Sequence, residues 1–405
     1  MKIFVLTPIY ATATTSQGAT PVVHYFTREW AKAGHQVTVF HLDSKFPRPL
    51  YWISRKFQHR LSTHVGYSVP LESPREDDYE VQGVTVHRRC LKKVIPHSLY
   101  SNKQLGYALD CIEKECEQNG TPDWFIGHWD NPQLELLCEL KKRFNKPICI
   151  VLHSNVFNYE AKYGKRWLEM LAQLDVIGFR SPIGLANFEK KYGKPKRSFI
   201  ASSGVSQIFL DEGAAIKKEF CHPIHNFVFV GSLIARKHPA TIITALSQAY
   251  PDGDFKITYI GDGAEKEVIE SEHRRLGDKG EVVFTGRIPR EEIIPFLKDS
   301  DVFVMVSKDE IFGLVYLEAM AMGLIPIGSK NEGIDGIIRN GENGFLCEAG
   351  NVSDLANALE RIKSLPKEQL QLISDHAKET AREYSDNGVA EKYIQYLEVF
   401  QIQMR

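Results

Sequence analysis

Short apolar runs alternate with amphipathic segments along most of this 405-residue chain. Runs that are apolar throughout, rather than at every second position, are typical of strands buried in a parallel sheet with helices on both faces. Such strands are predicted at residues 3–6, 37–42, 84–88, 124–127, 147–152, 176–179, 198–201, 227–230, 255–260, 282–285, 302–306 and 325–327. The alternation of strands and helices predicts an α/β protein with doubly wound sheets.

Between the strands, apolar residues recur every three or four positions, which is the period of an amphipathic helix. In the first of these segments, Thr20-Pro21 supplies a cap residue and a proline at the start, and Gly34 ends the helix. Further helices are predicted at residues 102–117, 133–143, 183–191 and 387–403. The last of them follows a sheet that is already complete, so it is expected to pack elsewhere.

Two segments depart from the alternation. Residues 44–67 mix basic and aromatic side chains; they are interpreted first as an insertion that packs its aromatics on its own domain. The alternative is peripheral contact of residues 45–67 with an anionic membrane surface, or a grip on an acceptor. Residues 202–226 lack a clear period and are predicted to be an interdomain linker. The chain therefore divides into domains at 1–205 and 206–386.

The composition, with 43% hydrophobic and 25% charged residues, is that of an ordinary globular protein. A net charge of −1 gives no overall attraction to nucleic acid, so no nucleic-acid partner is expected. Seven scattered cysteines without a Cys-x-x-Cys pair favour reduced thiols in a cytoplasmic protein over disulfides or a zinc site. The first ten residues faintly resemble a secretory signal, but Pro8 interrupts their apolar run. The predicted strand-loop-helix unit also needs this segment as its first strand.

Two histidines follow predicted strands directly. His128 comes after the strand at 124–127, and His153 after the strand at 147–152. Because ligands of open α/β sheets bind beyond the carboxyl ends of the strands, these two are better candidates for a functional role than the other twelve histidines. A structural role in tying down a loop is the alternative for both.

The stretch from Lys308 to Gly323 contains the clearest chemical pattern. Glu310 lies in a loop before a helix, and Glu318 lies about one and a half turns inside that helix. Between them, backbone N–H groups of Gly313, Leu314 and Val315 lie at the helix start, where they lack intrahelical acceptors. Two acids and a cluster of N–H donors suit a sugar joined to a phosphate.

Several motifs in order resemble the retaining glycosyltransferases of family 4, which have the GT-B fold. The pair Glu310 and Glu318, with seven residues between them that include Phe312-Gly313, is similar to that family's glutamate pair. Gly231-Ser232-Leu233 followed by Lys237 is similar to its phosphate-binding segment. Later landmarks of the family match at Gly261-Asp262-Gly263, Phe284-Thr285-Gly286 and Asn340-Gly341-Glu342-Asn343-Gly344-Phe345.

The resemblance implies two Rossmann-like doubly wound domains that face each other across a cleft. The second domain would hold the nucleotide sugar, the first the acceptor, and residues 387–405 would pack back on the first domain. By position, Glu318 would bind ribose, Glu310 the transferred sugar, and Lys237 the diphosphate. The N–H groups of Gly313, Leu314 and Val315 would bind the sugar or the diphosphate. Arg287 and Ile288 would lie near the base, and Gly18 beside the phosphates or the sugar. His153 would contact the sugar near the reaction centre.

The sequence departs from the family at two places. Ser232 stands where the family usually has an arginine beside the lysine, and Arg236 is the nearest alternative cation. The first loop reads Gln17-Gly18-Ala19 where many members have paired glycines.

The implied activity is retaining transfer of a hexose-type sugar from a nucleotide-diphosphate sugar to a hydroxyl acceptor. The acceptor would be a saccharide or a lipid-linked saccharide, in cell-surface polysaccharide or glycolipid assembly, at the cytoplasmic face of the membrane. Neither a metal nor a cofactor is expected. Three alternatives remain: a dinucleotide-dependent oxidoreductase, another GT-B enzyme such as a nucleotide-sugar epimerase, and a non-catalytic nucleotide-sugar-binding protein. The fingerprint of the oxidoreductase needs a third glycine at the position of Lys266.

Overall fold

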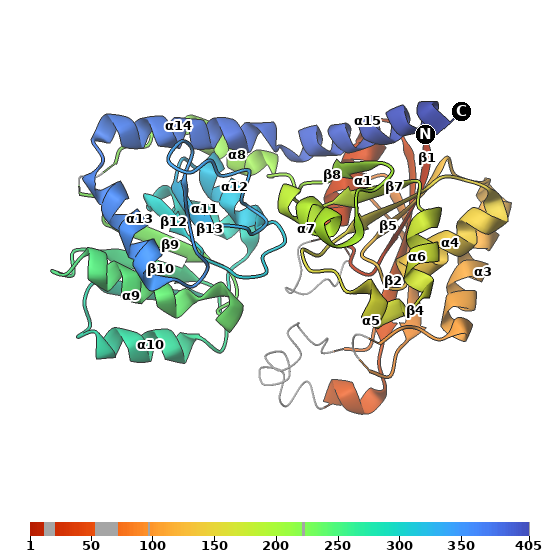
Figure 1. Cartoon of the computed structure of the whole chain (residues 1–405), viewed down its shortest axis with the longest axis horizontal. Coiled ribbons are helices and arrows are strands. Elements are labelled where there is room, and N and C mark those ends of the chain that lie inside the picture. The colour runs from red at the N-terminus through yellow and green to blue at the C-terminus, as the bar shows by residue number, and fades with distance from the viewer. Residues whose placement is uncertain (12–20, 53–71, 96–97, 221–222, 405) are drawn as a thin grey trace. The chain divides into compact units, whose positions relative to one another are not determined.

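The chain forms two compact units in a computed structural model that describes residues 1–11, 21–52, 72–95, 98–220 and 223–404 (Figure 1). Unit 1 comprises residues 1–180, 184–202 and 387–405, and unit 2 comprises 181–183 and 203–386. The main change of unit thus falls at residues 202/203, three residues before the predicted boundary. The segment predicted to be a linker is instead part of unit 2, because helix α8 (Gln207–Ala215) lies within it.

Among the described residues of unit 1, eight strands form one sheet in the order β3-β4-β2-β1-β5-β6-β7-β8. β3 runs antiparallel to β4, and the other neighbouring strands run parallel. The acidic pair Asp77-Asp78 belongs to β3, where Asp78 pairs with His87 of β4. The bounds are β1 (Lys2–Thr7), β2 (Gln36–Lys45), β3 (Asp77–Val81), β4 (Val84–Lys92), β5 (Trp124–His128), β6 (Ile148–Leu152), β7 (Val176–Phe179) and β8 (Ser198–Ile200).

Helices cover this sheet with the side chains that the apolar period identifies. In α1, Phe26 and Trp30 are buried, and α4 buries a row of leucines against β5 and β6. The bounds are α1 (Val22–Lys32), α3 (Asn102–Asn119), α4 (Gln133–Phe144), α5 (Tyr159–Tyr163), α6 (Arg166–Gln173) and α7 (Pro182–Tyr192).

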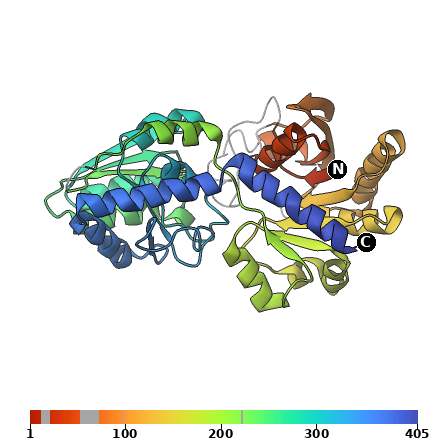
Figure 2. The ribbon, with the colours of Figure 1, turned by 90° about the horizontal axis from the view of Figure 1, so that it is seen from above.

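Helix α15 (Asp386–Met404) packs on unit 1, beside α1 (Figure 2). Trp30 donates its indole N–H to the carbonyl of Ala390 at 2.9 Å, and the ring of Tyr393 lies edge-on to Trp30 at 4.9 Å. Tyr393 also contacts Phe26 and Phe199. These buried aromatics connect α1 with α15, and Trp30 and Ala390 are 360 positions apart in the chain.

The described part of unit 2 contains a six-stranded parallel sheet in the order β11-β10-β9-β12-β13-β14. Helices α9, α10 and α13 lie together on one face, and α8, α12 and α14 on the other (Figure 1). The strands are β9 (Asn226–Val230), β10 (Lys256–Ile260), β11 (Glu281–Gly286), β12 (Val302–Val304), β13 (Ile325–Ser329) and β14 (Phe345–Cys347). The helices are α9 (Pro239–Ala249), α10 (Lys266–Arg275), α11 (Ile294–Lys298), α12 (Leu314–Ala321), α13 (Val352–Ser364) and α14 (Lys367–Glu383), with short 3-10 turns η1 (Ala235–Lys237) and η2 (Arg290–Ile293).

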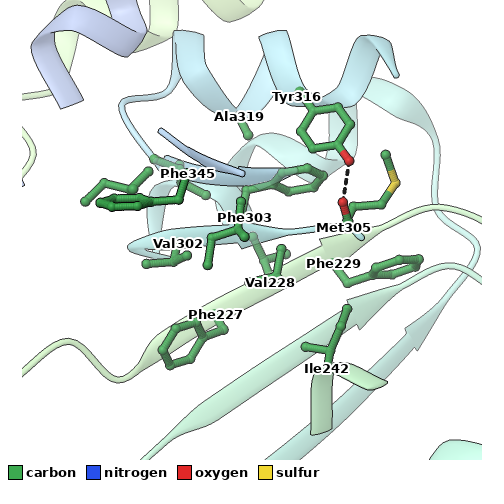
Figure 3. Packing of buried hydrophobic residues seen from close by; sticks show 14 of the residues in the cluster. Phe227, Val228, Phe229, Ile242, Val302, Phe303, Met305, Tyr316, Ala319 and Phe345 are labelled. Carbon is green, nitrogen blue, oxygen red and sulfur yellow. Dashed lines mark hydrogen bonds between the residues drawn. The ribbon is translucent and has the colours of Figure 1, made fainter. Parts of the chain in front are cut away.

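The core of unit 2 fixes α12 against the carboxyl end of β12 (Figure 3). The ring of Tyr316 lies edge-on to Phe303 at 5.1 Å, and its hydroxyl donates to the carbonyl of Met305. Tyr316 is fully buried, so this hydrogen bond satisfies a polar group that would otherwise be costly to bury. The loop between Met305 and α12 therefore starts and ends on rigid elements.

The strand order locates the region where each sheet is expected to bind ligands. In unit 2 the chain runs outward from β9 through β10 and β11 and then returns to β12 on the other side of β9. In unit 1 the corresponding neighbours are β1 and β5. The crevice outside the carboxyl ends of two such strands is the usual binding place in doubly wound sheets.

Only part of the basic-aromatic segment falls within the described residues. Phe46 and Tyr51 are buried, and the Tyr51 hydroxyl accepts a hydrogen bond from the Phe46 N–H, whereas Trp52 is exposed. Residues 53–71 lie outside the described residues, so membrane contact through 45–67 stays a prediction. Among the helices that the structure describes, none is both long and apolar enough to cross a bilayer.

Candidate functional site

Lys237 and Glu310 lie together at the carboxyl edge of the unit 2 sheet. Lys237 ends η1, after β9, and its Nζ is 3.9 Å from Oε2 of Glu310, in the loop after β12. The Nζ also lies 3.4 Å from the sulfur of Met305, and the lysine side chain is only 13% exposed. Burial lowers the pKa of Lys237, and the Glu310 carboxylate opposes that change. A partly desolvated cation at this edge suits an anionic ligand.

Glycines allow the loops around Lys237 to pack closely. A Cβ on Gly231 would lie 2.6 Å from the Nζ of Lys237, and one on Gly261 would lie 1.9 Å from the carbonyl oxygen of Gly231. The same two loops are joined by hydrogen bonds from the Gly231 N–H to Ile260 and from the Leu233 N–H to Asp262. The family motifs at 231–237 and 261–263 are thus two sides of one cradle.

The loop of Glu310 is held by a second acid that sequence reasoning missed. Glu332 accepts the Glu310 N–H at 2.8 Å, and the Gly333 N–H donates to the Glu310 carbonyl at 2.8 Å. Burial raises the pKa of Glu332, while the N–H groups of Asp309 and Glu310 oppose the rise. Nothing in the local pattern around Glu332 distinguishes it from a surface acid, because its partner lies 22 residues away.

Arg236 points to the same carboxylate. One of its guanidinium nitrogens lies 3.3 Å from Oε2 of Glu310, and its carbonyl accepts the N–H of Lys308 at 2.7 Å. Ser232, where the family has arginine, is exposed. The structure therefore brings the cation of Arg236 to the same carboxylate oxygen that Lys237 approaches.

Gly313 begins α12 beside these charges. Its φ of 78° lies in the left-handed region, which favours glycine, and a Cβ there would meet the Tyr316 ring at 2.6 Å. The position of that Cβ is also 3.4 Å from Cγ of Glu310. The first N–H groups of an α-helix, here including those of Leu314 and Val315, have no intrahelical acceptor and attract anions. The helix start and the two cations thus converge on one place.

Glu318 lies deeper than the motif suggests. It is 4% exposed, and Nε of Arg290 in η2 donates to its Oε1. Burial raises the pKa of Glu318, Arg290 opposes the rise, and Asp386 adds to it. The ribose assignment therefore concerns a carboxylate that already has a cationic partner, and sequence reasoning missed that partner.

Arg287, Ile288 and Gly18 are the other residues that are predicted to bind the donor. Arg287 is exposed, and Ile288 is partly buried against the core of unit 2. Gly18 lies outside the described residues, so its contact with phosphates or sugar stays a prediction.

In unit 1, the two candidate histidines contact each other. Nδ1 of His128 and Nε2 of His153 are 3.0 Å apart, so one ring donates to the other. Burial lowers the pKa of both imidazoles well below the usual value, and the nearby Arg180 adds to the effect. The pair is therefore neutral at physiological pH. This interaction accounts for the position of both rings without a ligand, as the structural alternative requires.

A cavity of about 240 Å³ adjoins this pair. Trp129, which has a φ of 65°, stacks on His153 with ring centroids 3.7 Å apart, and both rings line the cavity. The cavity also contains the ion pair of Lys162 and Asp130, whose atoms are 2.7 Å apart. Aromatic faces beside a carboxylate and an ammonium group can hold a polar ring compound. The sequence signal that was missed is the Trp129-Asp130 pair directly after His128.

The acids of the described residues do not assemble into a metal centre: no group of three or more His, Cys, Asp or Glu side chains could hold an ion. Two Asp-x-Asp sequences occur, at residues 252–254 and 299–301. Both precede strands, β10 and β12, and so lie at the amino edge of the sheet, away from Lys237. Asp301 is buried, with Lys218 at 3.8 Å. Metal independence stays a prediction.

Comparison with known proteins finds a family model that is similar to part of the second half of the chain. The model of the glycosyl transferases group 1 matches residues 224–379. The N-acetyl-alpha-D-glucosaminyl L-malate synthase of Bacillus anthracis is 32% identical over 148 residues, which is 36% of this chain and 38% of that protein. The lipopolysaccharide core biosynthesis glycosyltransferase LpsE of Rhizobium meliloti is 30% identical over 168 residues, 42% of this chain and 48% of its own length.

Solved structures match nearly the whole chain. Sucrose-phosphate synthase from Thermosynechococcus elongatus has a TM-score of 0.70 at 19% identity, with 99% of each chain covered. Anabaena HepE in complex with UDP has a TM-score of 0.68 at 16% identity, covering 98% of this chain and all of that one. The aligned sequence spans less than half of the curated relatives named above, and the structural matches establish the fold. Residues 224–379 are thus similar to the glycosyl transferases group 1, and the two parallel-sheet α/β units of the chain have the GT-B fold.

Proposed function

We propose that this protein is a retaining glycosyltransferase. It moves a hexose-type sugar from a nucleotide-diphosphate sugar to a hydroxyl of a saccharide or lipid-linked saccharide, in polysaccharide or glycolipid assembly. LpsE, named for lipopolysaccharide core biosynthesis, and HepE, solved with UDP, support the class of reaction and the donor.

The observation that carries the proposal is the meeting of Lys237, Arg236 and Glu310 at the switch point between β9 and β12, beside the start of α12. A departing diphosphate gains negative charge in the transition state. Charged donors and helix N–H groups that are already in place stabilise that charge without having to reorganise, each typically by about 3–4 kcal/mol. Glu310 orients both cations, and its carboxylate oxygens are acceptors of the kind that sugar hydroxyls require.

In this reaction the leaving phosphate takes the proton of the acceptor hydroxyl, so no side-chain nucleophile is needed. The neutral His128–His153 pair suits a sugar contact rather than a proton transfer, since the pKa of both rings lies well below the usual value. The cavity beside Trp129 is the acceptor-side candidate.

The first experiment is a thermal-shift screen with UDP-glucose, UDP-N-acetylglucosamine, GDP-mannose and NADH. A ligand at 100 times its dissociation constant stabilises the folded protein by about 2.7 kcal/mol. We expect a nucleotide sugar to raise the melting temperature and NADH to leave it unchanged. The reverse result favours a dinucleotide-dependent enzyme and refutes the proposal.

Donor hydrolysis then separates an enzyme from a binding protein. Wild-type protein is expected to release free sugar slowly from the donor that binds, with retained anomeric configuration by NMR. Lys237→Ala and Glu318→Ala are expected to lose this activity while circular dichroism shows a folded protein. Lys298→Ala is the matched control, because Lys298 is a surface residue of α11 that pairs with Glu212. Binding without turnover by the wild type, with or without saccharide acceptors, identifies a non-catalytic protein.

A further inference from the structure

We propose that Arg290 is a positioning residue that keeps the buried carboxylate of Glu318 ionised and oriented for the hydroxyls of the donor nucleotide. This inference rests on the proposed function, because it takes a nucleotide sugar as the ligand. It adds a residue outside every motif on which the family resemblance depends.

The geometry joins two distant elements. Arg290 begins η2, after β11, and Glu318 lies in α12, 28 residues later. The Arg290 Nε donates to Oε1 of Glu318, whose side chain is 5% exposed, while the arginine side chain is 26% exposed. The guanidinium also lies 5.7 Å from the ring centroid of Phe209 in α8. The arginine is thus held by an aromatic face and a carboxylate, and it remains in reach of solvent.

Burial and two charged groups, Asp386 and Arg290, act on the charge of Glu318. Burial is the largest influence and raises its pKa. Asp386, itself buried at the start of α15, raises it further, and Arg290 is the cation that lowers it. Phe209 faces the arginine but carries no charge. A single cation therefore opposes the two influences that favour protonation.

The charge state matters because of the hydrogen bonds that ribose would need. A carboxylate accepts bonds from two adjacent hydroxyls, whereas a protonated acid gives up part of that acceptor capacity. Bonds to an ionised acceptor are also about twice as strong as neutral ones. Arginine suits the role because its guanidinium stays charged at all physiological pH values.

The rival is a purely structural ion pair that pins η2 to α12. It predicts that replacing Arg290 weakens nucleotide binding to the same extent at every pH. A positioning role predicts an effect that depends on pH, since the lost cation can be offset by raising the pH above the new pKa of Glu318.

The test measures dissociation constants by calorimetry between pH 5 and 9 for wild type, Arg290→Gln and Arg290→Lys. UDP-glucose, UDP-N-acetylglucosamine and GDP-mannose are the probes, because they lack the terminal phosphate that titrates near pH 6. In Arg290→Gln the fall in affinity at acid pH is expected to begin about one pH unit higher, so binding weakens about tenfold within that window and recovers at pH 9. Arg290→Lys is expected to keep the wild-type profile. Parallel profiles for wild type and Arg290→Gln overturn the proposal.

A ligand-free measurement separates this inference from the proposed function. Carbon-13 NMR of labelled glutamate, with Glu318→Gln to assign the signal, gives the pKa of Glu318 directly. An unchanged pKa in Arg290→Gln refutes the electrostatic role whether or not nucleotides bind. If the pKa rises but wild type binds no nucleotide sugar, the proposed function fails and the positioning role falls with it. If Arg290→Gln does not fold, the other two variants provide the test. Arg290→Lys must then show the same fall in nucleotide-sugar affinity at acid pH as the wild type, and Glu318→Gln must lack that fall. Either failure overturns the inference.

Discussion

The contact between the two glycine loops of unit 2 yields the sharpest stability prediction. Gly261 has a φ of 143°, and a Cβ there would lie 1.9 Å from the carbonyl oxygen of Gly231. Since real Cβ contacts essentially never fall below 3.0 Å, Gly261→Ala must push the Gly231 backbone away by about 1 Å. Overpacking of this kind costs about 1–3 kcal/mol, and an alanine in the left-handed region adds about 1–2 kcal/mol. We expect a loss of about 2–5 kcal/mol in the free energy of unfolding of unit 2.

Gly277 provides the matched control. Its φ is 82°, and a Cβ there meets no atom within 4 Å. Gly277→Ala therefore carries the backbone strain without the overlap, and should cost about 1–2 kcal/mol. Urea denaturation followed by circular dichroism compares the two variants. Because Gly231 is packed against Lys237, Gly261→Ala should also weaken nucleotide-sugar binding, whereas Gly277→Ala should not.

The reasoning is refuted if the two variants unfold within about 0.5 kcal/mol of each other, since independent surface changes fall within that range. A Gly261→Ala protein that loses stability but binds nucleotide sugar like the wild type would contradict the link between the cradle and Lys237.

Three further predictions concern the chemistry. Lys237→Met should lower kcat/KM by about 10²–10³-fold in a transfer assay, while Lys298→Met stays near wild type; equal activities would exclude the diphosphate role. The His128–His153 pair should make the protein less stable below pH 6.5, because the unfolded chain binds protons first when the folded-state pKa is lowered. The slope should approach about 1.4 kcal/mol per pH unit for each imidazole, and His153→Asn should reduce it in urea denaturation at pH 5 and 7. Addition of EDTA should leave transfer unchanged, and a loss restored by Mg²⁺ or Mn²⁺ would show metal dependence.

Local patterns predicted the strands and helices that carry the site. The strand before Lys237 and the loop of Glu310 can be located from apolar runs and glycines, since both depend on neighbours in sequence. The doubly wound class follows from the same alternation, and the strand order agrees with it. Helix α8 was missed, because it is short and only Phe209 and Gly213 in it are buried, which leaves almost no apolar period.

The partners of the site residues could not be predicted in this way. Arg290 reaches Glu318 across 28 residues, and Glu332 reaches Glu310 across 22. Both contacts arise from the strand order, which brings distant loops to one edge of the sheet. The period of apolar residues along the chain does not predict the strand order. The same holds for His128 and His153: their place after strands was visible, but their hydrogen bond was not.

The membership of α15 in unit 1 has a consequence for how the protein is made. The indole N–H of Trp30 donates to the carbonyl of Ala390, which is 360 residues later in the chain. At a synthesis rate of about 5–20 residues per second, Ala390 is made about 20 to 70 s after Trp30. During that interval unit 2 emerges complete, whereas unit 1 still exposes the surface around Phe26 and Trp30 that Tyr393 later covers. The unit that the ribosome begins first is thus the one that finishes last, and for that time its uncovered aromatics are an exposed target for chaperones.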